Sequence, residues 1–166
     1  MTDQPERLYP GTWAERKPDH PAVIMGGSGD VMTFAELHET ACRVAQLYRS
    51  VGLETGDHVA ICLENRREYL ALAWGAVYAG VYCTAISSRL TAEELGYIIE
   101  DSESRIFITS PHKAAQVAEL RDQLAGLDLL ASIGGPVEGF QPLEDLLADQ
   151  PAEELPDAVE GKAMLY

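Results

Sequence analysis

Basic residues, cysteines and long apolar runs are all scarce in this sequence of 166 residues. Twelve Lys and Arg residues stand against 27 Asp and Glu residues, which gives a formal net charge of −15. A field of this sign repels phosphate backbones and anionic lipid surfaces, so we expect no nucleic-acid partner. No stretch approaches the roughly 20 consecutive apolar residues that a bilayer span needs, and we therefore do not expect an integral membrane protein.

The three cysteines are odd in number and show no Cys-x-x-Cys spacing. Cys42, Cys62 and Cys83 all lie in apolar patterns, which predicts buried thiols in a reducing compartment. The first ten residues carry Asp3 and Glu6 and no apolar run, unlike a secretory signal. The sequence therefore predicts a cytoplasmic protein.

Motifs for acyl hydrolysis and phosphate binding are missing as well. There is no Gly-x-Ser-x-Gly elbow to present a nucleophilic serine. Residues 26–29 are rich in glycine, but Met32 stands where a dinucleotide fingerprint needs glycine, and no Gly-Lys-Ser/Thr follows. We interpret the stretch as the turn of a hairpin over residues 22–34.

The histidines offer little further chemistry. His38 and Cys42 are four residues apart, as two ligands on one helix face would be, but the second histidine of the zinc-protease motif is absent. An amphipathic helix surface explains the pair better than a metal site. The other histidines stand at or beside turns, where solvated or capping roles are expected: His20, His58 and His112. We predict no catalytic residue and no metal ligand.

What the sequence does contain is an alternation of amphipathic helices and apolar strands over residues 33–133. Capping boxes begin at Thr33 and Thr91, and Gly52 and Gly80 are placed to end helices. Strands are expected at 58–63, 82–86, 105–109 and 129–133. This order predicts right-handed crossovers and an α/β fold, with a mainly parallel sheet covered by helices on both faces.

Two further helix starts follow from local signals. Asn65 with Glu68 predicts a cap for the second helix of the alternation. Ser110 followed by Pro111 predicts the start of one continuous helix that Gly126 closes.

Acidic residues are concentrated towards the end of the sequence. Between residues 138 and 160 there are eight Asp or Glu residues and no Lys or Arg. The stretch is either a docking strip for a basic partner or, as we favour, part of a solvated connecting segment over 134–162 with a short helix at 143–148. Residues 163–166 are apolar and look like the start of a truncated strand, so we expect a fragment that self-associates through uncovered apolar surface.

One polar turn stands out among the loops. Residues 87–90, with the sequence Ser-Ser-Arg-Leu, leave a predicted strand at its carboxyl end and enter a capped helix. Open α/β sheets bind ligands at this edge. The planar fork of Arg89 suits a phosphate. On the residues alone, an ion pair between Arg89 and Glu93, one turn further on, is the favoured alternative.

Several longer stretches resemble the adenylate-forming superfamily of acyl-CoA synthetases, luciferases and peptide-synthetase adenylation domains. VMTFAEL at 31–37 resembles its first core motif, and GDHVAI at 56–61 with Asn65 resembles the strand and turn that follow. WGAVYAGVYCTAI at 74–86 is similar to the second core motif, and SRLT at 88–91 continues it in the style of fatty-acid CoA ligases. The resemblance covers nearly the whole chain.

This resemblance implies the amino-terminal part of the large domain of an enzyme that joins a carboxylic acid, preferably a fatty acid, to AMP. Such an enzyme uses ATP and Mg²⁺ and passes the acyl group to the thiol of CoA. An arginine in the position of Arg89 can reach the nucleotide phosphate of CoA. The resemblance places the phosphate loop beyond Tyr166, so the fragment alone is expected to bind no cofactor and to be inactive. A non-catalytic α/β interaction module and a nucleotide-binding module are the alternatives.

Overall fold

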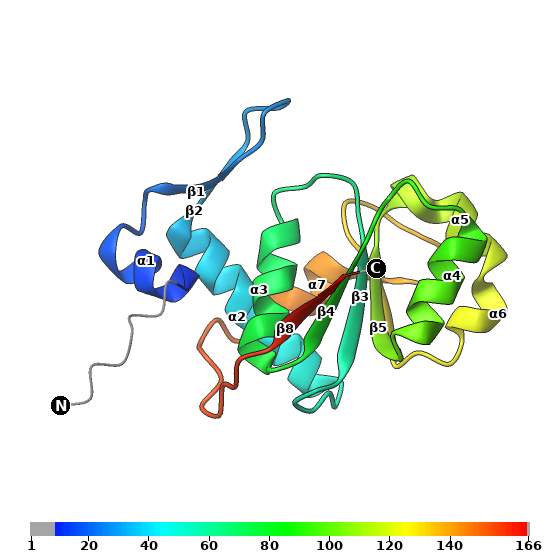
Figure 1. The fold of residues 1–166 in the computed structure, drawn as a ribbon. Coiled ribbons are helices and arrows are strands. Elements are labelled where there is room, and N and C mark those ends of the chain that lie inside the picture. Colours follow the sequence, from blue (N-terminus) through cyan, green and yellow to red (C-terminus); the bar gives the residue numbers. More distant parts are fainter. Residues whose placement is uncertain (1–8, 166) are drawn as a thin grey trace.

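A computed structural model describes residues 9–165 and has a six-stranded parallel sheet at its centre (Figure 1). The strand order is β7-β6-β5-β3-β4-β8, and each neighbouring pair is parallel. The strands are β3 (His58–Cys62), β4 (Tyr82–Ile86), β5 (Ser104–Thr109), β6 (Leu129–Ser132), β7 (Gln141–Pro142) and β8 (Lys162–Leu165). The predicted parallel α/β fold is confirmed.

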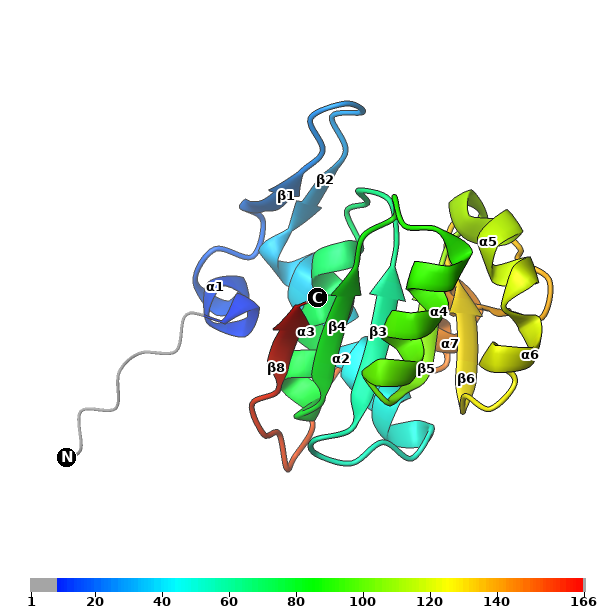
Figure 2. The same cartoon turned by 45° about the vertical axis from the view of Figure 1, so that its right-hand side comes forward.

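Helices cover both faces of this sheet, as Figures 1 and 2 show. One face packs against α2 (Phe34–Ser50), α3 (Tyr69–Ala79) and α7 (Leu143–Ala148). The other face packs against α4 (Ala92–Asp101), α5 (Ala114–Glu119) and α6 (Arg121–Leu124). Because α3 and α4 lie on opposite faces, the crossovers that enter and leave β4 run on different sides of the sheet.

The local signals for helix ends operate as the sequence predicts. The Thr33 hydroxyl accepts from the N–H of Glu36, and the Glu36 carboxylate accepts from the N–H of Thr33, which starts α2. The same reciprocal pair forms between Thr91 and Glu94 at the start of α4. Gly80 ends α3 with φ of 76°, a left-handed conformation that glycine adopts without a steric penalty.

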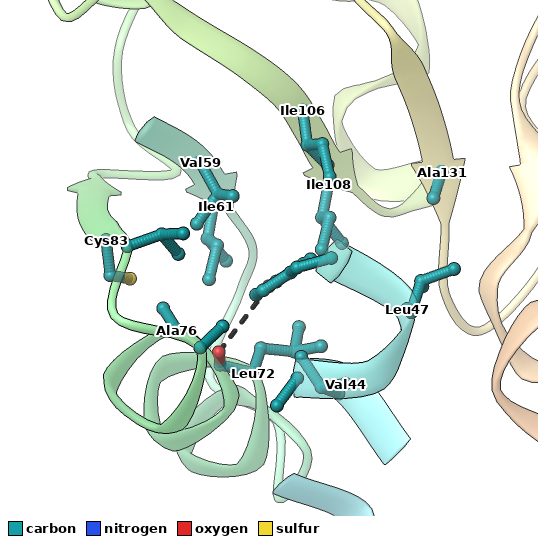
Figure 3. Close-up of a cluster of buried hydrophobic side chains, with 14 of the residues drawn as sticks. Val44, Leu47, Val59, Ile61, Leu72, Ala76, Cys83, Ile106, Ile108 and Ala131 are labelled. Atoms are coloured by element: carbon teal, nitrogen blue, oxygen red, sulfur yellow. Dashed lines mark hydrogen bonds between the residues drawn. The ribbon is translucent and has the colours of Figure 1, made fainter. Parts of the chain in front are cut away.

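The larger hydrophobic core lies between the sheet and helices α2 and α3 (Figure 3). Alternate residues of the central strands point into it, and Tyr48 is fully buried there with its hydroxyl 3.5 Å from the carbonyl oxygen of Leu72. The two helices pack closely because Gly75 has no side chain: a Cβ at this position would collide with Val44. Burying a large aliphatic side chain contributes about 1.5–3 kcal/mol, so this layer supplies much of the stability.

A two-stranded antiparallel sheet stands beside this body. β1 (Pro21–Ile24) pairs with β2 (Val31–Thr33), and the hairpin follows α1 (Pro10–Arg16) and leads directly into α2 (Figure 2). Figures 1 and 2 show its tip projecting away from the main sheet. None of the helices among residues 9–165 has the length and apolar character that crossing a membrane requires.

Two predicted helix starts are wrong in detail. Asn65 does not cap α3, which begins only at Tyr69 after a turn in which the Tyr69 N–H donates to the Arg66 carbonyl. The continuous helix predicted after Ser110 is instead a short 3₁₀ turn, η1 (Pro111–Lys113), followed by α5 and α6 with a break at Leu120. The Ser110 hydroxyl donates to the Glu64 carboxylate, so Ser110 does not cap this helix.

The acidic stretch near the end of the chain contributes to the fold. It contains α7 at Leu143–Ala148, and it also contains β7, a two-residue edge strand that the sequence did not predict. Leu143 is fully buried in the larger core. The stretch therefore supplies the strand at one edge of the sheet, and the chain then returns to form β8 at the other edge.

Candidate functional site

The carboxyl ends of β3, β4 and β5 meet at one edge of the sheet, where polar loops leave each strand. The helix that follows β3 covers one face, whereas the helices that follow β5 cover the other. Parallel sheets bind ligands at such a change in winding, because the loops there diverge and leave a crevice. This edge is the candidate site.

The turn at residues 87–90 is held at both of its ends. At its start the Ser87 carbonyl accepts from the Cys62 thiol at 3.7 Å and from the N–H of Leu90 at 3.4 Å. At its end the turn runs into the capping box of Thr91. The backbone N–H of Arg89 donates to the Ser87 hydroxyl at 3.3 Å. The turn thus has a defined conformation before any ligand arrives.

Lys113 holds the middle of this turn with two hydrogen bonds from its buried amine. Its amine donates to the carbonyl oxygens of Ser88 and Leu90 at 3.0 and 2.9 Å, and its side chain is only 2% exposed. These carbonyls belong to the residues on either side of Arg89. Sequence reasoning missed Lys113, since nothing in its spacing distinguishes it from a surface lysine.

Arg89 itself is exposed at the tip of the turn. Within residues 9–165, no carboxylate oxygen lies within 4.0 Å of its guanidinium, so the ion pair with Glu93 does not form. A hollow of about 510 Å³ lies next to the turn and is lined by Ile86, Leu90, Glu93 and Tyr97, among others. The guanidinium is therefore free to meet an anion from solution.

A polar network links the loops that follow β3 and β5. Ser110 donates its hydroxyl hydrogen to Glu64, and Arg66 pairs with Glu64 at 3.1 Å and with Glu68 at 3.4 Å. Burial raises the pKa of Glu64, but the bonds from Ser110 and Arg66 outweigh it and hold that pKa below its usual value. Glu64 is thus an ionised structural carboxylate with its partners in place, which disfavours a role as a general acid.

The His38 and Cys42 pair forms no metal centre either. His38 Nδ1 lies 3.0 Å from the Tyr78 hydroxyl, and the Cys42 thiol is 3.8 Å from His38 Nε2. Burial, with the nearby Glu154 charge, raises the pKa of Cys42 to about 12, so its thiol stays protonated. Across residues 9–165 no three His, Cys, Asp or Glu side chains are grouped to hold a metal ion. All three cysteines are buried free thiols, as predicted.

Several carboxylates of the acidic stretch bind the body of the protein. Glu138 pairs with Arg121 at 2.8 Å, and Glu154 lies 3.6 Å from His38. Glu144 accepts from the N–H of Gly134 at 2.7 Å. These three of the eight carboxylates therefore have partners within the protein, although Glu138 and Glu154 stay 82% and 68% exposed.

The fold and this edge define an open α/β protein with a preformed turn and an unpaired arginine where such sheets bind anionic ligands. The family described as AMP-binding enzyme matches residues 11–162. The chain therefore belongs to the AMP-binding enzyme family, as its resemblance to adenylate-forming enzymes predicts.

Individual relatives agree with this assignment. The chain is 35% identical to long-chain fatty acid transport protein 1 of Mus musculus over 91% of its own length and 24% of that protein. It is 28% identical to 4-hydroxybenzoate–CoA/benzoate–CoA ligase of Rhodopseudomonas palustris over 72% of the chain and 22% of the ligase. The crystal structure of the N-terminal domain of FACL13 from Mycobacterium tuberculosis superposes with a TM-score of 0.73 at 25% identity, over 89% of this chain and 36% of that one. The chain thus spans about a quarter of the curated relatives named here.

Proposed function

We propose that the protein is an ATP-dependent acyl-CoA ligase and that these residues form the amino-terminal scaffold of its large domain. Family membership supports this proposal, together with the similarity to an N-terminal domain of known structure. In the proposed reaction a carboxylate oxygen attacks the α-phosphorus of ATP and pyrophosphate leaves. The CoA thiol then attacks the acyl carbonyl and AMP leaves. Adenylation is needed because a carboxylate oxygen is a poor leaving group and AMP a good one.

The residues described here contribute positioning to that reaction and no chemical step. Among residues 9–165 no three His, Cys, Asp or Glu side chains are grouped to hold a metal ion, and the 166 residues contain no Gly-Lys-Ser/Thr phosphate loop. We accordingly propose that residues 1–166 alone form no thioester. ATP and Mg²⁺ would be held by other parts of the protein.

The role we propose for Arg89 is to bind the nucleotide phosphate of CoA. Three observations support it: the guanidinium is exposed, it has no carboxylate partner within residues 9–165, and Lys113 holds the carbonyls on both sides of it. A guanidinium makes two parallel hydrogen bonds to a phosphate, and each charge-assisted bond contributes about 1.5–3 kcal/mol. The preformed turn reduces the entropy that is lost on binding.

Replacing Arg89 in the complete protein tests this role. Arg89→Ala is expected to raise the apparent KM for CoA by at least about tenfold, because the loss of even one charge-assisted bond of about 1.5 kcal/mol lowers affinity by about that factor. Adenylation, followed as pyrophosphate exchange into ATP, is expected to stay nearly unchanged. Arg89→Lys keeps the charge but not the fork and is expected to recover part of the loss. An equal loss in both half-reactions, with a lower melting temperature, would show that Arg89 is a structural residue.

For the acid we propose a fatty acid rather than an aryl acid. The sequence of residues 82–90 resembles fatty-acyl ligases, and the 35% identical relative is named for long-chain fatty acids. A relative named for benzoates matches at 28% identity, so aryl acids are the competing class. The decisive measurement is AMP release by the complete protein with CoA and either decanoate, palmitate or benzoate. Faster turnover with benzoate than with either fatty acid would contradict the proposal.

A non-catalytic interaction module is the other function considered for this chain. It would rely on the acidic stretch at 138–160, and three of those carboxylates are engaged within the protein by Arg121, His38 and the N–H of Gly134. An independent nucleotide-binding module would need a complete phosphate loop within these residues. The ligase proposal therefore has the better support.

A further inference from the structure

A second hollow lies beneath the short helices α5 and α6, on elements other than the turn that carries Arg89. It has a volume of about 410 Å³, within the range of about 300–1,000 Å³ that is common for small-molecule sites. Its lining is almost entirely apolar. Side chains from both helices, from β6 and from the loop before β7 contribute to it, including Val117, Leu124, Leu130, Val137 and Phe140.

The hollow lies beside the break between α5 and α6. The chain turns at Leu120, α6 starts at Arg121, and Leu120 and Leu124 both pack into the core on this face of the sheet. The adjoining positions 118 and 125 are alanines, whose short side chains leave the space above Leu130 open. Phe140 closes the far side and packs edge-to-face on buried Phe107, with ring centroids 6.0 Å apart.

The rim of the hollow carries one cation and one carboxylate, in a chain whose formal net charge is −15. Arg121 and Glu138 are the only charged side chains among the described residues that line the hollow. They form an ion pair at 2.8 Å, and their side chains are 62% and 82% exposed. An ion pair this exposed stabilises the protein little, so another carboxylate can take the place of Glu138 on Arg121 at small cost.

We propose that this hollow binds an aliphatic carboxylate. The alkyl chain occupies the apolar space above Leu130, and the head group forms a forked pair with Arg121 at the rim. The lining suits an apolar chain, and the single cation at the rim suits a negative head group. The elements that form this hollow are not those of the Arg89 turn, so the proposal does not rest on the role proposed for Arg89.

Decanoate and 1-decanol, titrated calorimetrically into the purified protein, test the dependence on head-group charge. Decanoate is expected to bind at least about tenfold more tightly than 1-decanol, because only decanoate pairs with the guanidinium. Arg121→Gln is expected to weaken decanoate binding by about tenfold and to leave 1-decanol unaffected. Glu138→Gln frees Arg121 and is expected to tighten decanoate binding. Equal binding of the two ligands, or no binding of decanoate, would overturn the proposal.

A matched pair of substitutions on α5 tests the location. Ala118 lines the hollow and Ala115 does not, yet both are exposed, so a larger side chain at either position avoids overpacking the core. Ala118→Phe is expected to abolish the binding component that depends on Arg121, whereas Ala115→Phe is expected to keep it. Circular dichroism establishes that both variants are folded. Retention of that component in Ala118→Phe would refute the site.

Discussion

Lys113 offers a sharp test of how the candidate site is held together. Its buried amine donates to the carbonyls of Ser88 and Leu90, so Lys113→Met removes two hydrogen bonds and leaves both acceptors without that partner. Hydrogen bonds from a charged group contribute about 1.5–3 kcal/mol each, and the relief of burying the amine offsets part of the loss. We expect a net loss of about 2–4 kcal/mol in the free energy of unfolding.

Urea denaturation measures this loss directly, and Lys162→Met is the matched control. Lys162 is an exposed lysine on β8, where the same chemical change is expected to cost less than about 0.5 kcal/mol. In the complete protein, Lys113→Met is also expected to raise the KM for CoA, because the turn that presents Arg89 loses its support. If Lys113→Met is as stable as Lys162→Met, the amine does not hold the turn and our account of the site is wrong.

Three further outcomes follow from packing and from shifted pKa values. Gly75→Ala is expected to lower stability by about 1–3 kcal/mol in thermal unfolding, because the new methyl group meets Val44, even though alanine favours helices. Burial raises the pKa of Asp57, but the N–H of Glu54 and the Arg105 guanidinium lower it more, to below its usual value. The stabilisation that ionised Asp57 contributes is therefore complete above the ordinary aspartate pKa of about 3.9 and is lost as the pH falls through the lower pKa of Asp57 in the folded protein. In urea titrations, Asp57→Asn is expected to weaken this loss of stability at acid pH. Burial raises the pKa of Cys83 to about 12, and Ellman's reagent at pH 8 is expected to label this thiol only after denaturant is added.

The parts of the fold that sequence predicted well are those governed by neighbouring residues. The capping boxes at Thr33 and Thr91 formed because both partners lie within one helical turn of each other. Gly80 ended a helix because its left-handed conformation is a property of one residue. The apolar strands between these signals could pair in parallel only by crossing over, so the fold class followed from their order.

The parts that sequence missed depend on contacts between distant residues. Ser110 has a good capping side chain, but Glu64, 46 residues away, accepts its hydrogen bond instead. Lys113 is buried because two carbonyls 25 and 23 residues away need a donor. Arg89 lacks the Glu93 partner that one-turn spacing suggested. A local sequence pattern does not indicate such long-range contacts, and the candidate site depends on them.

The position of β8 beside β4 has a consequence for how the chain folds as it is made. Tyr82 pairs with Lys162, which lies 80 residues later in the sequence. At about 5–20 residues per second, a ribosome needs roughly 4–16 s to supply that partner. The strands β3, β4 and β5 are adjacent in the sheet and are synthesised first, so the centre of the sheet can assemble early while one edge of β4 stays unpaired. An unpaired strand edge is a template for pairing with other chains, so this interval is when aggregation competes most strongly with folding.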